Sequence, residues 1–248
     1  RWSAGEWPAD RALARRRRSL TVLSTVDFLA TVPLLSGVDR VELEKFAELT
    51  RERIYPRSSV ILFEDDPGDS LFIVRQGRVK VVLIGEDGRE VILGILGVGS
   101  HFGELSLIDG EPRSAHVIAM DESLLIVLRR EDFRKRVQES PSVAWALLGE
   151  LSRRLRRADA KIGSLVLLDV DGRIARLLLD AADESAADGG VIEKRLTHQT
   201  IAQIIGASRE TVSRAMRTFQ TRGLIAVQRR QVIITDRGGL EKLAHVRL

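Results

Sequence analysis

The side chains best suited to recognition chemistry lie in one short stretch of the chain, between Leu196 and Arg217. At their spacing, Arg209, Glu210 and Arg214 share one face of a helix, with Ser213 beside them. An arginine can donate two hydrogen bonds to guanine O6 and N7, and a glutamate can accept one from cytosine N4. The stretch therefore indicates a helix that reads the base edges of DNA.

Two helices separated by a glycine would position these side chains. Thr197 is a suitable N-cap for the first helix, and Gly206 can take the left-handed conformation that ends it. Ser208 then caps the second helix. The apolar face of the first helix would comprise Ile201, Ile204 and Ile205, and that of the second Val212, Ala215, Met216 and Phe219; the outward face of the second would carry Arg209, Glu210, Ser213, Arg214 and Arg217.

A capped helix, a turn containing glycine and a polar second helix are the parts of a helix-turn-helix. Other donor side chains can bond phosphates and so set the register on DNA. These are Thr197, His198, Gln199 and Thr211. Two short β runs follow between Val227 and Thr235, and a separate helix over Arg173–Ala182 precedes. Three helices and a small hairpin predict a winged helix-turn-helix domain over residues 170–248.

The other chemistry of the chain is limited by its composition. It has no Cys, which excludes disulfides, thiol catalysis and iron–sulfur clusters, and which fits a cytoplasmic protein. The four histidines, His101, His116, His198 and His245, form no set with metal-ligand spacing, so we expect no metal. No apolar run reaches the roughly 18 residues that a membrane helix needs.

Charge is distributed unevenly along the 248 residues, although the net charge is only +4. Residues 1–24 are rich in Arg and lack an apolar stripe, so we expect a mobile basic tail. The middle of the chain is acidic. Residues 170–248 carry 13 basic and 9 acidic side chains, which suggests that this part meets a polyanion.

Between Tyr55 and Leu128 the sequence pattern is typical of an antiparallel β domain. Short β-rich runs recur at Val60–Phe63, Leu71–Val74, Val79–Ile84, Val91–Leu96, His116–Met120 and Leu124–Leu128. Glycine-bearing turns separate them, and Asp87-Gly88 gives the clearest hairpin signal. Ahead of these runs, the apolar spacing over Val38–Leu49 predicts a short amphipathic helix. We expect a sandwich or barrel over residues 25–141.

A long helix is expected to join the two domains over residues 142–169. Its apolar residues are Leu148, Leu151, Leu155, Ala158, Ile162 and Leu165, spaced alternately three and four apart. This narrow seam favours a two-stranded coiled coil, and hence a homodimer, over a helix lying on the β domain. Asp169–Gly172 is expected to break the helix.

The order of these features resembles the Crp/Fnr family of bacterial transcription regulators. The resemblance covers residues 28–240 and includes Gly206 to Arg214, Phe102 to Ser114, and Leu168 to Ile174. It implies an α+β fold, with an antiparallel cyclic-nucleotide-binding β-roll that is jelly-roll-like, a dimerisation helix and a winged helix-turn-helix.

The resemblance also implies that residues 102–114 form a phosphate-binding cassette. In that role Gly103 permits close approach of the backbone, and Arg113 neutralises the phosphate charge. Ser114 and backbone amides cradle the phosphate, and Glu104 accepts a bond from the ribose 2′-hydroxyl. Leu105 also belongs to the ligand-binding residues that the resemblance implies. The alternative is a loop in which Glu104 and Arg113 pair only with each other.

The expected dimer helix departs from the family's cyclic-AMP pattern. Cyclic-AMP receptors of this family carry Thr-Ser where this chain has Ala158 and Asp159, and those hydroxyls recognise adenine. A carboxylate only accepts hydrogen bonds, which suits the two donors of the guanine edge. Asp159 could instead pair with Arg156 or with an arginine of the partner helix. Arg154 matches a family position near the ligand phosphate.

We therefore expect a sequence-specific transcription regulator that binds double-stranded DNA as a homodimer at a two-fold symmetric site. Cyclic AMP, cyclic GMP or cyclic di-GMP would control it, and RNA polymerase would be a partner. The alternative is a regulator of the same type with a vestigial effector pocket. An enzyme would need a nucleophile or a metal set near the cassette, and an architectural binder would not need the Arg-Glu-Arg face.

Overall fold

The structure is a computed structural model that describes residues 23–35, 37–184, 191–192, 196–228 and 231–244. Of the basic tail expected at residues 1–24, residues 1–22 lie outside the described residues. The chain divides into two compact units. One comprises Arg1–Val82 with Ile95–Leu151, and the other Leu83–Gly94 with Ser152–Leu248.

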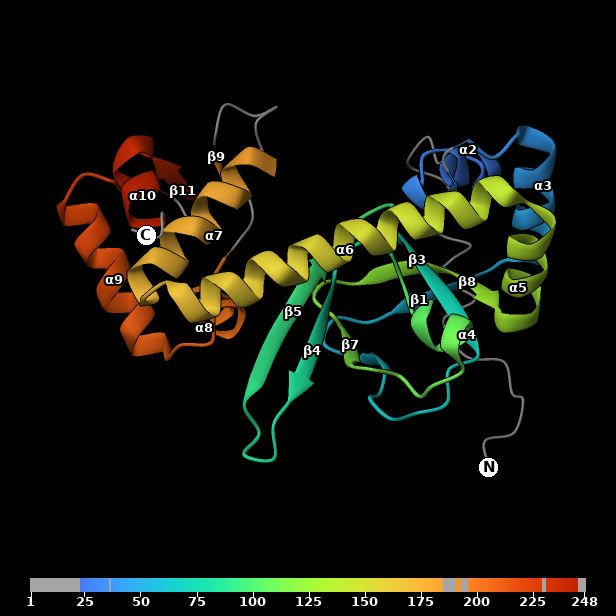
Figure 1. Ribbon diagram of the computed structural model, residues 1–248, viewed down its shortest axis with the longest axis horizontal. Helices are drawn as coiled ribbons and strands as arrows, with labels where there is room; N and C mark the ends of the chain where they lie inside the picture. Colours follow the sequence, from blue (N-terminus) through green and yellow to red (C-terminus); the bar gives the residue numbers. More distant parts are fainter. Residues whose placement is uncertain (1–22, 36, 185–190, 193–195, 229–230, 245–248) are drawn as a thin grey trace. The chain divides into compact units, whose positions relative to one another are not determined.

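The β region consists of two four-stranded sheets among the described residues, and most of its strands are labelled in Figure 1. In the first sheet the order is β1 (Arg51–Tyr55), β8 (Ser123–Arg129), β3 (Ser70–Gln76) and β6 (His101–Phe102), all antiparallel. In the second the order is β2 (Val60–Leu62), β7 (His116–Ala119), β4 (Val79–Ile84) and β5 (Glu90–Leu96). Strands that are far apart in the sequence, such as β1 and β8, are neighbours in these sheets. This arrangement matches the expected β-roll.

The central strands β3 and β8 are buried on both faces. On β3, Leu71 and Ile73 belong to a core cluster shared with helices, whereas Phe72 and Val74 belong to a second cluster. That second cluster includes Val117 of the other sheet. Because alternate side chains point to opposite faces, a strand covered on both sides has an unbroken apolar sequence. This explains why the run at 71–74 does not alternate with polar residues.

Helices cover the outer face of the first sheet. They are α2 (Thr25–Ala30), a 3-10 turn (Pro33–Leu35), α3 (Arg40–Leu49), α5 (Arg130–Glu139) and the start of α6 (Pro141–Leu167). The Asp39 side chain accepts a hydrogen bond from the Glu42 N–H at 2.9 Å. Because this cap begins α3 at Arg40, the helix starts two residues later than the expected Val38.

The long yellow helix in Figure 1 is α6, which matches the helix expected over 142–169. Its end differs in detail from the expected break at Asp169–Gly172. Asp169 Oδ1 accepts from the Gly172 N–H at 2.8 Å, so α7 (Val170–Glu184) begins at Val170 and contains Gly172. The glycine serves packing here, because a Cβ at this position would lie 2.8 Å from Leu243 O.

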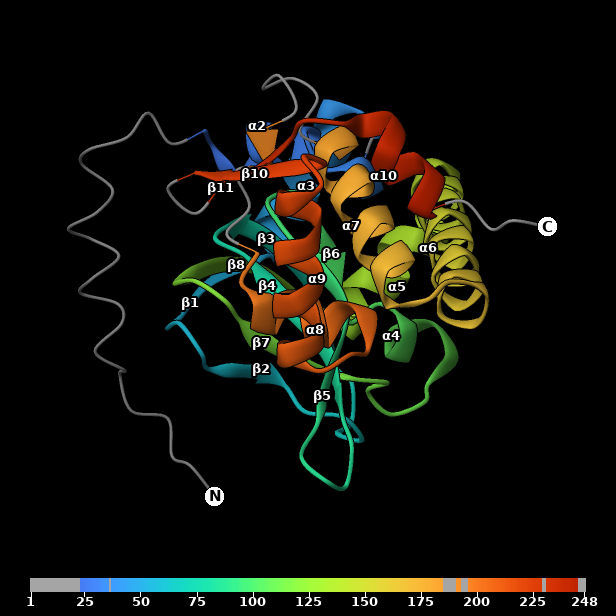
Figure 2. The same cartoon turned by 90° about the vertical axis from the view of Figure 1, so that its left-hand side faces the viewer.

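The winged part of the second unit has its own core, built around Ile174, Leu178, Ile201 and Phe219. Its helices are α7, α8 (His198–Ile205), α9 (Arg209–Thr221) and α10 (Arg237–Ala244). In Figure 2, β10 (Ile225–Gln228) and β11 (Gln231–Ile234) run side by side as an antiparallel pair. β11 also pairs with β9 (Val191–Ile192). The expected fold class, an α+β chain with a β-roll, a long helix and a winged helix-turn-helix, is confirmed.

Replacing Gly172 by Ala should destabilise the protein by about 1–3 kcal/mol, because the added methyl group would press on the main chain of α10. Gly238→Ala is the matched control. The nearest atom to its new Cβ is 3.7 Å away, so it should be neutral or stabilise by up to about 1 kcal/mol. Urea unfolding measures both effects, and equal midpoints for the two variants would contradict the close approach.

Candidate functional site

Side-chain caps and a left-handed glycine fix the two helices α8 and α9. Thr197 Oγ1 accepts a hydrogen bond from the Thr200 N–H at 3.0 Å, and Ser208 Oγ accepts from the Thr211 N–H at 3.1 Å. Between the helices, Gly206 has φ +68°, a conformation that side chains disfavour. The caps and the turn therefore set the start of α9 within the motif itself.

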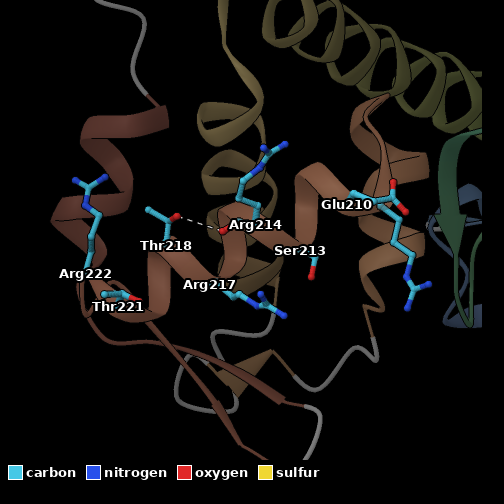
Figure 3. A pocket seen from close by; sticks show the side chains of 8 residues that line it. Glu210, Ser213, Arg214, Arg217, Thr218, Thr221 and Arg222 are labelled. Carbon is cyan, nitrogen blue, oxygen red and sulfur yellow. Dashed lines mark hydrogen bonds between the residues drawn. The ribbon is translucent and has the colours of Figure 1, made fainter.

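α9 has one buried and one exposed face. The buried face consists of Val212, Ala215, Met216 and Phe219, and the exposed face begins with Arg209, Glu210, Arg214 and Arg217. The exposed side chains line a shallow hollow together with Ser213, Thr218, Thr221 and Arg222. Figure 3 shows the labelled arginines extending away from the ribbon of α9. This arginine-rich, hydrogen-bonding surface can meet both base edges and phosphates.

A second polar site lies in the first unit, where β6 leads into the short helix α4 (Leu105–Asp109). Gly103 has φ +84°, and a Cβ there would lie 2.8 Å from Arg113 Nη1. The guanidinium of Arg113 donates to Gly103 O at 2.7 Å and to Ser70 O at 2.8 Å. The backbone around Gly103 thus wraps closely around one buried cation.

The surroundings of Arg113 act on the pKa of its guanidinium in both directions. Its burial lowers the pKa of the guanidinium, and the charge of Arg130 lowers it further. The carboxylates of Asp69, Glu104 and Asp66 raise that pKa. Because a guanidinium loses its proton only at very high pH, Arg113 keeps its charge. A buried cation beside a close backbone turn is suited to an anion such as a phosphate.

Two family models match the parts of the chain that contain these two candidate sites. A family model described as the cyclic nucleotide-binding domain matches residues 52–140, and one described as the Crp-like helix-turn-helix domain matches residues 172–243. A CRP-like cAMP-activated global transcriptional regulator of Mycobacterium tuberculosis is 34% identical over 221 residues, which are 88% of this chain and 99% of the relative. The chain belongs to the Crp/Fnr family.

Two further members of the Crp/Fnr family illustrate its range. The cAMP-activated global transcriptional regulator CRP of Salmonella typhimurium is 33% identical over 77% of this chain and 93% of its own length. The structure of CLP from Xanthomonas campestris, described as a c-di-GMP responsive global regulator, is 28% identical with a TM-score of 0.69. It covers 79% of this chain and 99% of the CLP chain. The comparisons thus identify this chain as a DNA-binding transcription regulator with a cyclic nucleotide-binding domain.

The DNA-contacting residues expected from the sequence all lie on or beside α8 and α9. His198 and Gln199 occupy the first turn of α8, and Ser213 is half-buried on α9. The hydroxyls of Thr197 and Ser208 are engaged in the helix caps. Thr211 Oγ1 lies 3.0 Å from Ser208 Oγ. These hydroxyls stabilise the helix starts, and contact of Thr197, Ser208 and Thr211 with DNA stays a prediction.

Sequence reasoning left out the C-terminal part of this surface. Thr218, Thr221 and Arg222 line the same hollow as Arg214. Their positions repeat its helical spacing, since residues three to four and seven to eight apart share one face. Extending the 3.6-residue period past Arg217 would have found them.

The expected ligand residues divide between the two units. Glu104 and Arg113 are buried in the first unit, whereas Leu105 and Ser114 are exposed there. Arg154 is half-buried and Asp159 exposed on the part of α6 that belongs to the second unit. The contact of Arg154 and Asp159 with a ligand therefore stays a prediction.

Within the described ranges, no three His, Asp or Glu side chains are grouped so that they could hold a metal ion. In the same part of the chain, every helix is too short or too polar to cross a bilayer.

Proposed function

We propose that this chain acts as a homodimeric, sequence-specific transcription regulator whose affinity for DNA is controlled by a cyclic nucleotide. The observation that carries the proposal is the outward face of α9, where Arg209, Glu210 and Arg214 are exposed on a helix with a fixed start. Such a helix can enter the major groove and bond base edges. We further propose that RNA polymerase is a partner, as expected for a transcription regulator.

The apolar seam of α6 supports the dimer. In the single chain, exposed fractions are 54% for Leu148, 63% for Leu155, 59% for Ile162 and 43% for Leu165. A row of large apolar side chains in water is unfavourable and usually marks an interface. Its heptad spacing suits a second copy of the same helix, related by two-fold symmetry.

The cassette around Arg113 supports a phosphate-bearing effector. The named relatives respond to cyclic AMP or cyclic di-GMP, and by analogy we assign this chain an effector of the same chemical class. A ligand that favours one of two arrangements of the α6 helices would change DNA affinity. Coupling of about 1–3 kcal/mol corresponds to about 5–150-fold in affinity.

The base of the effector is a separate part of the proposal, and it depends on Asp159. An ionised carboxylate cannot donate to adenine N1, whereas it can accept from both donors on the guanine edge. We therefore propose a guanine nucleotide, cyclic GMP or cyclic di-GMP, as a stronger candidate than cyclic AMP.

A ligand-independent regulator is the second candidate. The observation in its favour is that two guanidinium nitrogens of Arg113 already donate to Gly103 O and Ser70 O. A cation satisfied by the protein backbone has less need of a phosphate. In this case DNA affinity would not change when any cyclic nucleotide is added.

Arg209→Ala and Glu210→Ala should each lose about 1–3 kcal/mol of discrimination at a G·C position of the half-site. Binding to random DNA should change much less. Arg222→Ala is the matched control, because it removes a charge from the far end of α9 and should weaken all sequences alike. Competition binding measures the three variants. If Arg209→Ala and Glu210→Ala weakened binding to all DNA sequences equally, base reading would be contradicted and only contact with phosphates would remain.

Leu155→Lys should dissociate the dimer, because it places two ammonium groups in the seam. Ala160→Lys adds the same charge on the opposite side of α6 and should leave the dimer intact. Sedimentation measures the oligomeric state, and a footprint of the wild-type protein should cover two half-sites about 34 Å apart. A dimeric Leu155→Lys variant would contradict the assignment of the seam.

The double variant Ala158→Thr with Asp159→Ser should shift nucleotide preference toward adenine. It restores two hydroxyls and removes an acceptor that a guanine edge needs, and such an unmet pairing costs about 1–3 kcal/mol. Arg113→Ala should abolish binding of every nucleotide. Calorimetric titration with cyclic AMP, cyclic GMP and cyclic di-GMP compares the variants with the wild type.

Two results of these titrations would change the proposal. Wild-type protein that binds cyclic AMP at least as tightly as each guanine nucleotide would leave Asp159 without a base-selecting role. Wild-type protein that binds none of the three would favour the ligand-independent regulator.

A further inference from the structure

Arg130 joins two backbone segments that border Arg113. It is the first residue of α5, and its Nε donates to Gly68 O at 3.1 Å. Its Nη2 donates to Ser106 O at 3.1 Å and also to Gly68 O. Gly68 lies in the turn before β3, whereas Ser106 lies in α4. One side chain therefore holds together a turn and a helix that are far apart in the sequence.

The turn and α4 are packed closely around Arg113. A Cβ on Gly68 would lie 2.3 Å from Ser106 Cβ and 3.0 Å from Arg113 Cζ, so only glycine fits. The two acceptors of the Arg113 guanidinium, Ser70 O and Gly103 O, follow the turn and precede α4, respectively. A shift between the turn and α4 would therefore separate these two acceptors and displace the guanidinium.

α4 depends on outside donors for its position. It has only five residues, and helices this short are not stable alone. Carbonyl groups in the last turn of a helix lack partners within the helix. Arg134, one turn along α5, donates from Nε to Leu107 O at 2.9 Å. Arg130 adds a second donor to Ser106 O, which already accepts from the Gly110 N–H at 3.2 Å. Positive charge at this end of a helix also suits its dipole.

We propose that Arg130 is a positioning residue of the nucleotide site, which holds the Gly68 turn and α4 at the separation that Arg113 needs to meet a phosphate. This inference rests on the proposed function, since it presumes that the cassette takes a nucleotide. Arg130 acts through Arg113 and the backbone of α4. Its forked guanidinium suits the task, because a fork can bond two separate carbonyl groups at fixed angles.

The charge of Arg130 supports the same assignment. It lies close enough to Arg113 to lower the pKa of that guanidinium, and burial lowers this pKa more strongly. Like charges repel, so the pair is held in place by bonds to backbone carbonyls and by nearby carboxylates. A phosphodiester anion would relieve the remaining repulsion.

The test compares Arg130→Gln with Arg129→Gln in the full chain. Arg129 is the neighbouring residue, and its side chain is exposed, so the control removes the same charge without the two contacts. Calorimetry measures the affinity for cyclic AMP, cyclic GMP and cyclic di-GMP. For whichever cyclic mononucleotide binds more tightly, it also measures the two phosphorothioate diastereomers. Each of these replaces one non-bridging oxygen by sulfur, a poor hydrogen-bond acceptor, so their affinity ratio reports how the donors around the phosphate are placed.

Arg130→Gln should weaken nucleotide binding about tenfold or more and bring the diastereomer ratio close to one, while Arg129→Gln changes neither. Thermal unfolding without ligand shows whether each variant is folded. If Arg130→Gln does not fold, Arg130→Lys decides the matter, because it keeps the charge but not the fork and should still reduce the diastereomer ratio.

An unchanged affinity and ratio in the folded Arg130 variant would overturn the positioning role and leave the proposed function intact. Wild-type protein that binds no nucleotide would overturn both. The two failures are thereby distinguished by the wild-type titration alone.

Discussion

The pairing of β3 with β8 is the interaction on which the first unit depends. Both strands are buried on both faces, so they form the wall between the two core clusters. Their register places Ser70 opposite Arg129, which brings the end of β8 to the turn that precedes β3. The Arg130 N–H consequently donates to Asp69 O at 2.7 Å. The pairing that closes the core therefore also assembles the surroundings of Arg113.

The two candidate sites are built in different ways. The first turn of α9 is fixed by Ser208, Gly206 and other residues within a few positions of the helix start. The outward face of α9 is therefore ordered before a partner binds. Little order has to be gained on binding, which favours affinity. The surroundings of Arg113 come instead from three separate segments, containing Gly68, Gly103 with Ser106, and Arg130. A site of this kind responds to shifts in any of its walls.

This difference explains what the sequence could and could not predict. The caps, the left-handed glycine and the buried face of α9 depend on local spacing and match the expected pattern. On α8, Ile201 and Ile205 are buried as expected, but Ala202 is buried as well and Ile204 is only half-buried. Gly103 and Arg113 were found only through a family resemblance. Neither Gly68 nor Arg130 belongs to a pattern that the sequence analysis uses. Their roles arise from contacts with residues distant in the chain, which no periodicity records.

Strands and helices follow the same rule. β4 lies where expected, because its residues and the Asp87-Gly88 turn are strong local signals. α2, β6, β9 and α10 were not anticipated, since each is short or weakly patterned and owes its form to its neighbours. α10, for instance, packs so closely on α7 that only a hydrogen fits at Gly172.

β1 was also missed, and the reason bears on how the protein avoids aggregation. It is an edge strand of the first sheet, and its Arg51 and Arg53 side chains are exposed. An unpaired strand edge can recruit strands from other molecules, and charged residues on it discourage such growth. The opposite edge, β6, has only two residues, and β2 at an edge of the second sheet has three and an irregular register. The charges that hide β1 from a hydrophobicity pattern are thus those that keep its open edge from templating fibrils.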